Sequence, residues 1–290
     1  MINVELKGGA VKEFENGTTP AEIAKSIGAG LYKSVCCAKV DGDLCDLRTP
    51  LEKDCKVELL TFDNVDGQKT FWHTASHVLA QAVKRLYPNA KCAIGPAVDN
   101  GFYYDFDVEK PFSPEDLEKI KAEMKKIVKS GLELERVELS PEEAEKKLEE
   151  MNEPYKVELV KEHSDKGEHI TFYKQGEFID LCAGPHLMSV APIKAIELTA
   201  CTGAYWRGDA NNAQLCRVYG VAFPKASMLE EHLKKLEEAK LRDHNKLGRE
   251  LEYFTTVDYV GQGLPILLPK GARVVQLLQR WVEDVEQSKG

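Results

Sequence analysis

The alternation of apolar and polar positions near the N-terminus predicts a small unit of strands around a single helix. Thr19 and Pro20 supply an N-cap and a first-turn proline, and Glu22 completes a capping box, so a helix is expected to begin there and to end near Gly28. Strands are expected on both sides of it, at residues 2–6, 11–15, 35–40 and 57–62. Two strands, a helix and two more strands are typical of a small α+β unit of the β-grasp kind.

From residue 63 to 224 the pattern mixes amphipathic helices with short strands and indicates a larger α+β body. Pro88 ends the first helix, and Ser-Pro-Glu sequences at 113–115 and 140–142 supply the residues that begin the other two. Helices are expected at residues 71–87, 113–130 and 140–152. Strands are expected at residues 94–106, 155–160, 170–182, 193–206 and 214–221.

After residue 224 the apolar positions become sparse. Residues 227–248 indicate a helix rich in Lys, Glu and Arg with only a narrow apolar stripe, which favours a solvated helix between two bodies over a coiled coil. Residues 251–268 and a helix at 272–285 then begin a further unit. This last stretch offers too little chain for a core of its own, and we expect the unit to be truncated.

Composition narrows the class of protein. The 290 residues carry a formal net charge of −9, which argues against a protein that coats nucleic acid nonspecifically. No apolar run is long enough to span a bilayer, and the N-terminus lacks the pattern of a secretory signal. Eight scattered cysteines without a CxxC pair indicate free thiols rather than a disulfide framework, so we expect a cytoplasmic protein with no membrane partner.

Two pairs of ligand-type residues with the same spacing carry the clearest chemistry. His73 and His77 are one helical turn apart on one face, and Cys182 and His186 repeat the spacing downstream. Three imidazoles and a thiol match the ligands of a tetrahedral zinc site, and the same side chains also suit a metal-free pocket in which imidazoles activate water. A metalloprotease is excluded, because Thr74 occupies the position of its catalytic Glu.

Two aromatic segments each admit two interpretations. Residues 203–209 place Arg207 next to Tyr205 and Trp206. In one interpretation Arg207 binds phosphate and the aromatic side chains stack on a base. In the other, the glycines of the segment form turns and the aromatic side chains belong to the core. Residues 99–104 end in Tyr104 and form either a turn and a strand or the wall of a pocket.

A set of longer motifs in a fixed order carries a family resemblance. They are HTASHVLAQAVKRLYP, AIGPAVDNGFYYDFDV, YKVELV, FIDLCAGPHL, TGAYWRGDANNAQLCRVYG and LEEAKLRDHNKLGRELEYF. Together they resemble bacterial threonyl-tRNA synthetases over essentially the whole chain. The resemblance implies a TGS domain of ubiquitin-like β-grasp fold at 1–62, an α+β tRNA-editing domain shared with alanyl-tRNA synthetases at 63–224, a linker helix at 225–247 and the start of a class II catalytic domain at 248–290.

The resemblance also implies an activity, the hydrolysis of mischarged seryl-tRNA(Thr) to serine and tRNA(Thr). By position, the family's editing residues fall on His73, His77, Lys156, Asp180, Cys182 and His186. The histidines are expected to orient and activate water, Lys156 to stabilise the carbonyl oxygen or contact the ribose, and Asp180 to bind the seryl ammonium or hydroxyl group. Cys182 is expected to line the pocket or to join a metal site rather than to act as a covalent nucleophile.

Cofactors and partners follow from the same resemblance. Editing is expected to require no cofactor, and ATP is not expected because the family's later motifs for ATP and threonine lie beyond residue 290. Zinc is the alternative, held by His73, His77, Cys182 and His186. The expected partner is the acceptor end of tRNA(Thr) carrying serine, contacted by Tyr104, Tyr205 and Arg207. We expect this part of the family protein to be a monomer. The alternative function is a tRNA-binding module, or a remnant of the full enzyme, without turnover.

Overall fold

The structure, a computed structural model, describes residues 1–261 and 263–290. They form two compact units, residues 1–229 and residues 230–290. Helices and strands are mixed along the chain, which confirms the expected α+β class. Within the described ranges, no helix is long and apolar enough to cross a membrane. The finer division of the chain at residues 62, 224 and 247 stays a prediction.

The first unit begins with a five-stranded sheet in the order β2-β1-β5-β3-β4. Its strands are β1 (Ile2–Leu6), β2 (Val11–Phe14), β3 (Val35–Val40), β4 (Asp43–Cys45) and β5 (Cys55–Thr61). β1 and β5 run parallel, and the other neighbours are antiparallel. Helix α1 (Pro20–Ile27) buries Ile23 and Ala24 in one core with Val4 and Val57 of the sheet. This is the β-grasp arrangement that the sequence pattern predicted.

Helix α1 begins with the predicted capping box. The backbone N–H of Thr19 donates to Oε2 of Glu22 at 2.8 Å, and the backbone N–H of Glu22 donates to Oγ1 of Thr19 at 3.3 Å. The helix ends at Ile27, next to the expected Gly28. Helix α2 (Ala29–Ser34) and strand β4 were not predicted. α2 has six residues and no side-chain N-cap, so its local sequence signal is weak.

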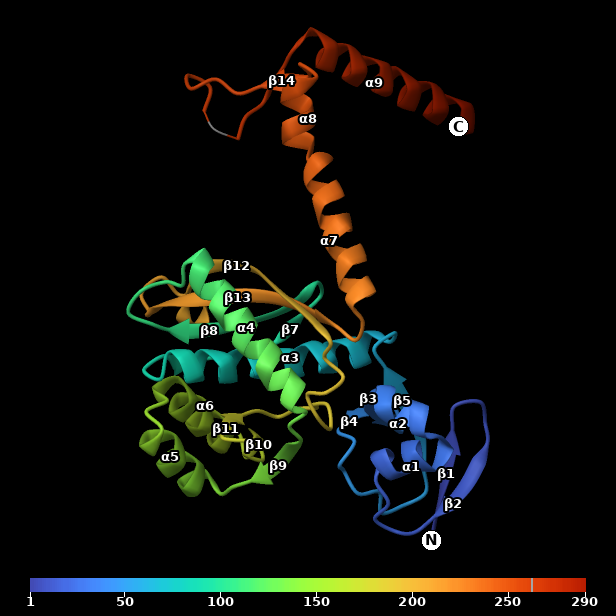
Figure 1. Ribbon diagram of the computed structural model, residues 1–290. Helices are drawn as coiled ribbons and strands as arrows, with labels where there is room; N and C mark the ends of the chain where they lie inside the picture. The colour runs from blue at the N-terminus through green and yellow to red at the C-terminus, as the bar shows by residue number, and fades with distance from the viewer. Residues whose placement is uncertain (262) are drawn as a thin grey trace. The chain divides into compact units, whose positions relative to one another are not determined.

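The rest of the first unit contains two further sheets with helices packed on them (Figure 1). One sheet is built from β6 (Lys91–Cys92), β7 (Ala97–Val98), β8 (Gly101–Asp107), β12 (Ala195–Tyr205) and β13 (Gln214–Phe223). The other is antiparallel and contains β9 (Leu134–Glu138), β10 (Thr171–Gln175) and β11 (Phe178–Leu181). The helices are α3 (Val65–Leu86), α4 (Pro114–Ser130), α5 (Pro141–Glu150) and α6 (Pro154–Asp165). α3 and α4 pack on the first sheet, and α5 and α6 pack on the second.

The strand expected at residues 155–160 is wrong, because these residues lie in helix α6. Pro154 occupies the first turn of the helix, where its missing N–H costs no hydrogen bond. The buried residues Lys156 and Val160 are four apart, which is the helical spacing, and Val160 joins the core formed by α5 and the three-stranded sheet. The segment was misread because valines are β-branched and favour strands. Strand β9 was not predicted either.

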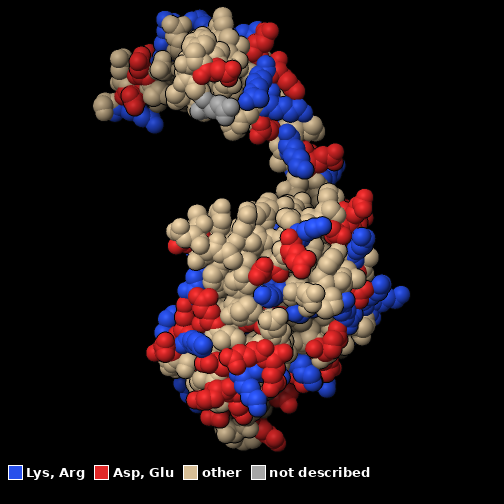
Figure 2. Space-filling model, turned by 90° about the vertical axis from the view of Figure 1, so that its left-hand side faces the viewer, with Lys and Arg blue, Asp and Glu red and all other residues tan. Residues whose placement is uncertain are grey.

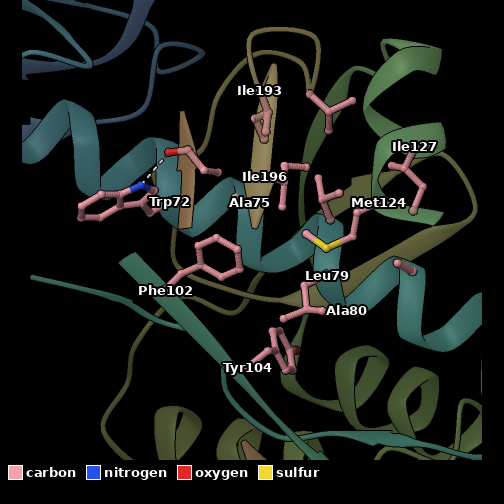
Figure 3. Close-up of a cluster of buried hydrophobic side chains, with 14 of the residues drawn as sticks. Trp72, Ala75, Leu79, Ala80, Phe102, Tyr104, Met124, Ile127, Ile193 and Ile196 are labelled. Atoms are coloured by element: carbon pink, nitrogen blue, oxygen red, sulfur yellow. Dashed lines mark hydrogen bonds between the residues drawn. The ribbon is translucent and has the colours of Figure 1, made fainter. Parts of the chain in front are cut away.

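Helix α3 lies in the middle of the main core of the first unit. From Gly67 to Val83 most of its residues are buried, and the polar ones among them, such as Thr74 and Gln81, form hydrogen bonds inside the protein. Figure 3 shows Ala75 and Leu79 of this helix among side chains of β8, α4 and β12. The indole N–H of Trp72 donates to the backbone oxygen of Ala222 in β13 at 2.8 Å, and this buried bond ties the helix to the sheet.

The second unit contains most of α7 (Ala226–Leu241), together with α8 (His244–Glu250), β14 (Phe254–Thr255), β15 (Ile266–Leu267) and α9 (Pro269–Lys289). The single helix expected at 227–248 is therefore wrong in one respect, since it is divided in two. Asp243 separates α7 from α8, because it is the N-cap of α8. Its Oδ1 accepts from the backbone N–H of Lys246 at 2.9 Å.

Replacing Trp72 by Phe should lower the free energy of unfolding of the first unit by about 1–3 kcal/mol, because the buried carbonyl of Ala222 loses its indole donor. Urea unfolding followed by circular dichroism measures the change. Trp281→Phe is the matched control, since Trp281 is 63% exposed and should change the transition by less than about 0.5 kcal/mol. Equal effects of the two substitutions would contradict the importance of the bond.

Candidate active site

The predicted pocket residues converge on one cavity of about 380 Å³ in the first unit. They come from α3, α6, β11 and the loop that follows β11, and they are His73, His77, Lys156, Asp180, Cys182 and His186. All but His186 line the cavity, whereas His186 is fully buried. The 94–96 segment, including Gly95, also lines the cavity.

The thiol and the imidazoles form a tight cluster. Sγ of Cys182 lies 3.3 Å from Nε2 of His73 and 3.2 Å from Nε2 of His186. The ring of His186 lies 4.2 Å, centre to centre, from the rings of both His73 and His77. The backbone N–H of Gly184 donates to Sγ of Cys182 at 3.3 Å, which places a dipole on the sulfur. The two pairs of the sequence therefore make a single site.

Thr74 fixes the tautomer of His186. The hydroxyl of Thr74 donates to the backbone oxygen of Thr70 at 3.0 Å, so its oxygen acts as acceptor for Nδ1–H of His186 at 3.2 Å and for the backbone N–H of Leu187 at 3.0 Å. His186 then carries its proton on Nδ1, and the lone pair of Nε2 faces Cys182. This role of Thr74 has no signal in the local sequence, because it depends on a residue 112 positions away.

Burial keeps two of these imidazoles neutral at physiological pH. It lowers the pKa of His73 to about 4, although the negative charge of Asp180 opposes the shift. Burial also holds the pKa of His186 well below its usual range, and the neighbouring His73 and His77 act in the same direction. A neutral imidazole that lines a cavity is able to accept a proton from water, which is the property that a general base needs.

Lys156 and Asp180 form a buried ion pair in the cavity wall. Nζ of Lys156 lies 2.7 Å from Oδ1 of Asp180, and both side chains are 5% exposed. Burial alone would lower the pKa of Lys156, but the charge and hydrogen bond of Asp180 outweigh it and raise that pKa. Burial likewise acts to raise the pKa of Asp180, and Lys156, His77 and Tyr104 together hold it below its usual value. Both groups are therefore charged at neutral pH.

Tyr104 lies behind this ion pair rather than at the cavity surface. It is fully buried on β8, and its hydroxyl donates to Oδ2 of Asp180 at 2.6 Å. Nε2 of His77 lies 3.6 Å from the same oxygen. Gly95 packs so closely on the ring of Tyr104 that a Cβ at residue 95 would lie 2.1 Å from Cδ2. The geometry thus gives Tyr104 a place as a support for Asp180, and its contact with substrate stays a prediction.

The other two residues predicted to contact tRNA, Tyr205 and Arg207, are exposed at the end of β12 and just after it. Tyr205 is 43% exposed. Arg207 pairs with Glu158 at 2.8 Å and with Glu162, both on α6, and its guanidinium carbon lies 5.4 Å from the ring centre of Trp206. Phosphate binding by Arg207 would have to compete with these carboxylates, and it remains a prediction.

The cluster also fits the requirements of a metal site. The ligand atoms of His73, His77, Cys182 and His186 all lie within 4.8 Å of one another. Tetrahedral zinc places such atoms roughly 3.3–3.8 Å apart, which the two sulfur–nitrogen distances nearly match. Nδ1 of His77 is buried without a hydrogen-bond partner in the part of the chain that the structure describes. The donor set therefore suits a zinc ion.

Gly184 sets the path of the loop between Cys182 and His186. Its φ is +76°, and a Cβ there would lie 2.3 Å from the hydroxyl oxygen of Tyr173. Gly184→Ala should lower the free energy of unfolding by at least about 1 kcal/mol more than Gly167→Ala, because only the first adds a steric clash. Gly167 has a φ of +70° with nothing within 4 Å of its Cβ position, so both variants share the backbone strain. Equal losses in urea unfolding would contradict the close contact.

Comparisons with known proteins match both parts of the first unit. Residues 2–61 match the TGS domain, and residues 170–219 match the threonyl and alanyl tRNA synthetase second additional domain. The second match contains Asp180, Cys182 and His186. It leaves out α3 and α6, which carry the other pocket residues.

Curated relatives extend the similarity to the whole chain. Threonine–tRNA ligases of Clostridium perfringens, Clostridium botulinum and Acetivibrio thermocellus are 57%, 56% and 53% identical over 290 residues. The match covers 100% of this chain and 45% of each relative, so the chain spans less than half the length of these relatives. The chain therefore contains a TGS domain and a threonyl and alanyl tRNA synthetase second additional domain, and over its whole length it is similar to the N-terminal 45% of threonine–tRNA ligases.

Proposed function

We propose that the pocket hydrolyses the ester bond of seryl-tRNA(Thr) and releases serine and tRNA(Thr). The observation that carries the proposal is the cavity itself, in which a neutral imidazole, a buried lysine cation and a carboxylate face the same space. Ester hydrolysis needs a proton acceptor for water and a positive group for the developing oxyanion, and these side chains supply both.

The chemistry of threonine selection explains why such a pocket is useful. A site that accepts threonine also admits serine, since the missing methyl group changes binding by only about 1–3 kcal/mol. A second site that removes serine from the tRNA restores accuracy. The similarity to threonine–tRNA ligases supports tRNA(Thr) as the partner, and it supports action in the cytoplasm, where tRNA is used.

His73 is the base in the proposed reaction. It lines the cavity in neutral form, takes a proton as water attacks the ester carbonyl, and returns it to the ribose oxygen as the carbonyl–oxygen bond breaks. His186 is buried behind it and orients the cluster through Cys182. A direct attack by water needs no covalent intermediate on Cys182.

Lys156 and Asp180 divide the recognition of charge between them. The ammonium group of Lys156 stabilises negative charge on the carbonyl oxygen, while Asp180 keeps it in place. The carboxylate of Asp180 accepts from Lys156 and Tyr104 and retains lone pairs for the ammonium group of serine.

The charge distribution bears on how tRNA is held. The face in Figure 2 shows acidic and basic side chains intermixed, with acidic groups gathered over the lower part. With a net charge of −9, the chain must contact the nucleic acid through local groups rather than through a broad positive field.

A zinc ion at the cluster would be held by His73, His77, Cys182 and His186, and it would activate water only if one of these four side chains left its coordination position open to the water. The proposed reaction does not depend on it, because His73 and Lys156 supply the base and the positive charge.

Release of serine from preformed seryl-tRNA(Thr) tests the proposed function. The wild-type chain should release serine faster than threonine from the matched threonyl-tRNA(Thr). His73→Ala should slow the release by about 100-fold or more through loss of the base. His244→Ala in α8 is the matched control and should leave the rate unchanged. Release at the spontaneous rate by the wild-type chain would instead indicate a tRNA-binding module without turnover.

Treatment with a chelator separates the metal-free reaction from a zinc-dependent one. After dialysis against o-phenanthroline, the wild-type chain should retain its rate of serine release, because no step requires a metal. Metal content is measured on the same sample by mass spectrometry. A rate that falls with the zinc content and returns with added Zn²⁺ would show that the cluster is a catalytic metal site.

A further inference from the structure

A contact network joins the β-grasp part of the first unit to the loop that carries His186. It begins at Asp46 and Arg48, directly after β4, and Asp46 is only 8% exposed. Oδ1 of Asp46 accepts from the backbone N–H of Arg48 at 2.9 Å and from its Nη1 at 3.0 Å. The two side chains are therefore held in a fixed relation before they reach the other part of the unit.

Asp46 bonds to two groups next to the pocket. Its Oδ2 accepts from the hydroxyl of Tyr173 at 2.8 Å and from the backbone N–H of His186 at 3.2 Å. The ring of Tyr173 lies 4.4 Å from the imidazole of His186. Burial and the charge of Asp46 raise the pKa of Tyr173, so this hydroxyl keeps the proton that it donates.

Arg48 bonds to three backbone carbonyls on the pocket side. Nη2 donates to the oxygen of Leu187 at 2.8 Å, Nε to that of Leu134 at 3.0 Å and Nη1 to that of His186 at 3.4 Å. The planar guanidinium presents these donors in a rigid fork, which the single ammonium group of a lysine does not reproduce. Both backbone groups of His186 are thus bonded to side chains from the β-grasp part.

We propose that Asp46 and Arg48 are positioning residues of the hydrolytic pocket, so that the β-grasp part completes the pocket by fixing His186. The inference rests on the proposed function of the pocket. With its backbone held by these two residues and its Nδ1 bonded to Thr74, the imidazole of His186 has one orientation available. In that orientation Nε2 lies 3.2 Å from Cys182, which in turn lies 3.3 Å from Nε2 of His73.

A purely structural role makes a different prediction. If Asp46 and Arg48 served only to dock two parts of the fold, their replacement would lower stability while the folded molecules kept the wild-type rate. A positioning role lowers the rate of the folded molecules, because a displacement of about 1 Å at a reacting group slows catalysis by about 10- to 100-fold.

Single-turnover release of serine from seryl-tRNA(Thr) measures this difference, with Asp46→Asn and Asp54→Asn as matched variants. Asp54 lies in the same β-grasp part, where it accepts from Asn3 in an exposed bond. Asp46→Asn should lower the maximal rate by about 10- to 100-fold, with the concentration of enzyme at half-maximal rate within about two-fold of wild type. Asp54→Asn should leave both unchanged. If Asp46→Asn does not fold, Arg48→Lys takes its place with the same expectation.

The ¹⁵N spectrum of the imidazoles is a second readout that does not depend on activity. In the wild type, His186 should show a proton on Nδ1, and this signal should shift or broaden in Asp46→Asn but not in Asp54→Asn. Positioning requires both the slower release and the changed His186 signal, and either one unchanged overturns it. If the wild-type chain releases no serine, the proposed function fails, and the His186 signal alone decides whether Asp46 positions the imidazole.

Discussion

The buried ion pair between Lys156 and Asp180 is the interaction on which the pocket depends. Taking two charges out of water costs several kcal/mol per ion unless their geometry and further hydrogen bonds offset the loss. Here the 2.7 Å contact between the charged atoms is supplemented by the hydroxyl of Tyr104. A second cavity, of about 290 Å³, shares these two side chains as its wall, so the pair also separates two spaces. Removal of either partner would leave an uncompensated buried charge.

Helix α3 connects the core to this site. One of its faces packs Phe71 and Leu79 into the main core, while His73 and His77 lie one turn apart and face the cavity. The position of both imidazoles is therefore set by the packing of the entire helix rather than by a loop. Two other elements supply the ion pair in the cavity wall, Lys156 from α6 and Asp180 from β11.

Features with a local physical cause could be predicted from the sequence. The capping boxes at Thr19, Ser113 and Ser140 fixed where three helices begin, since each depends on residues within one turn. The pair His73 and His77 and the pair Cys182 and His186 share an i, i+4 spacing, and this spacing predicted all four residues of the cluster. The structure places their ligand atoms close together.

Features that depend on contacts far apart in the chain could not be predicted in this way. Lys156 was expected on a strand because its valine neighbours favour one, whereas packing against the three-stranded sheet makes the segment a helix. Tyr104 was predicted only as a strand or pocket-wall residue that contacts the tRNA end, and the bond from its hydroxyl to a carboxylate 76 residues away was not predicted. The bond between Asp46 and His186 spans 140 residues and leaves no local pattern in the sequence.

A double-mutant cycle on the ion pair tests the central claim most directly. Single-turnover release of serine from seryl-tRNA(Thr) would be measured for the wild type, Lys156→Met, Asp180→Asn and the double variant. The proposed mechanism predicts that each single variant loses most of the rate and that the double variant loses no more than the slower single one, because the pair acts as a unit. Losses that multiply, or a wild-type rate equal to spontaneous hydrolysis, would contradict it.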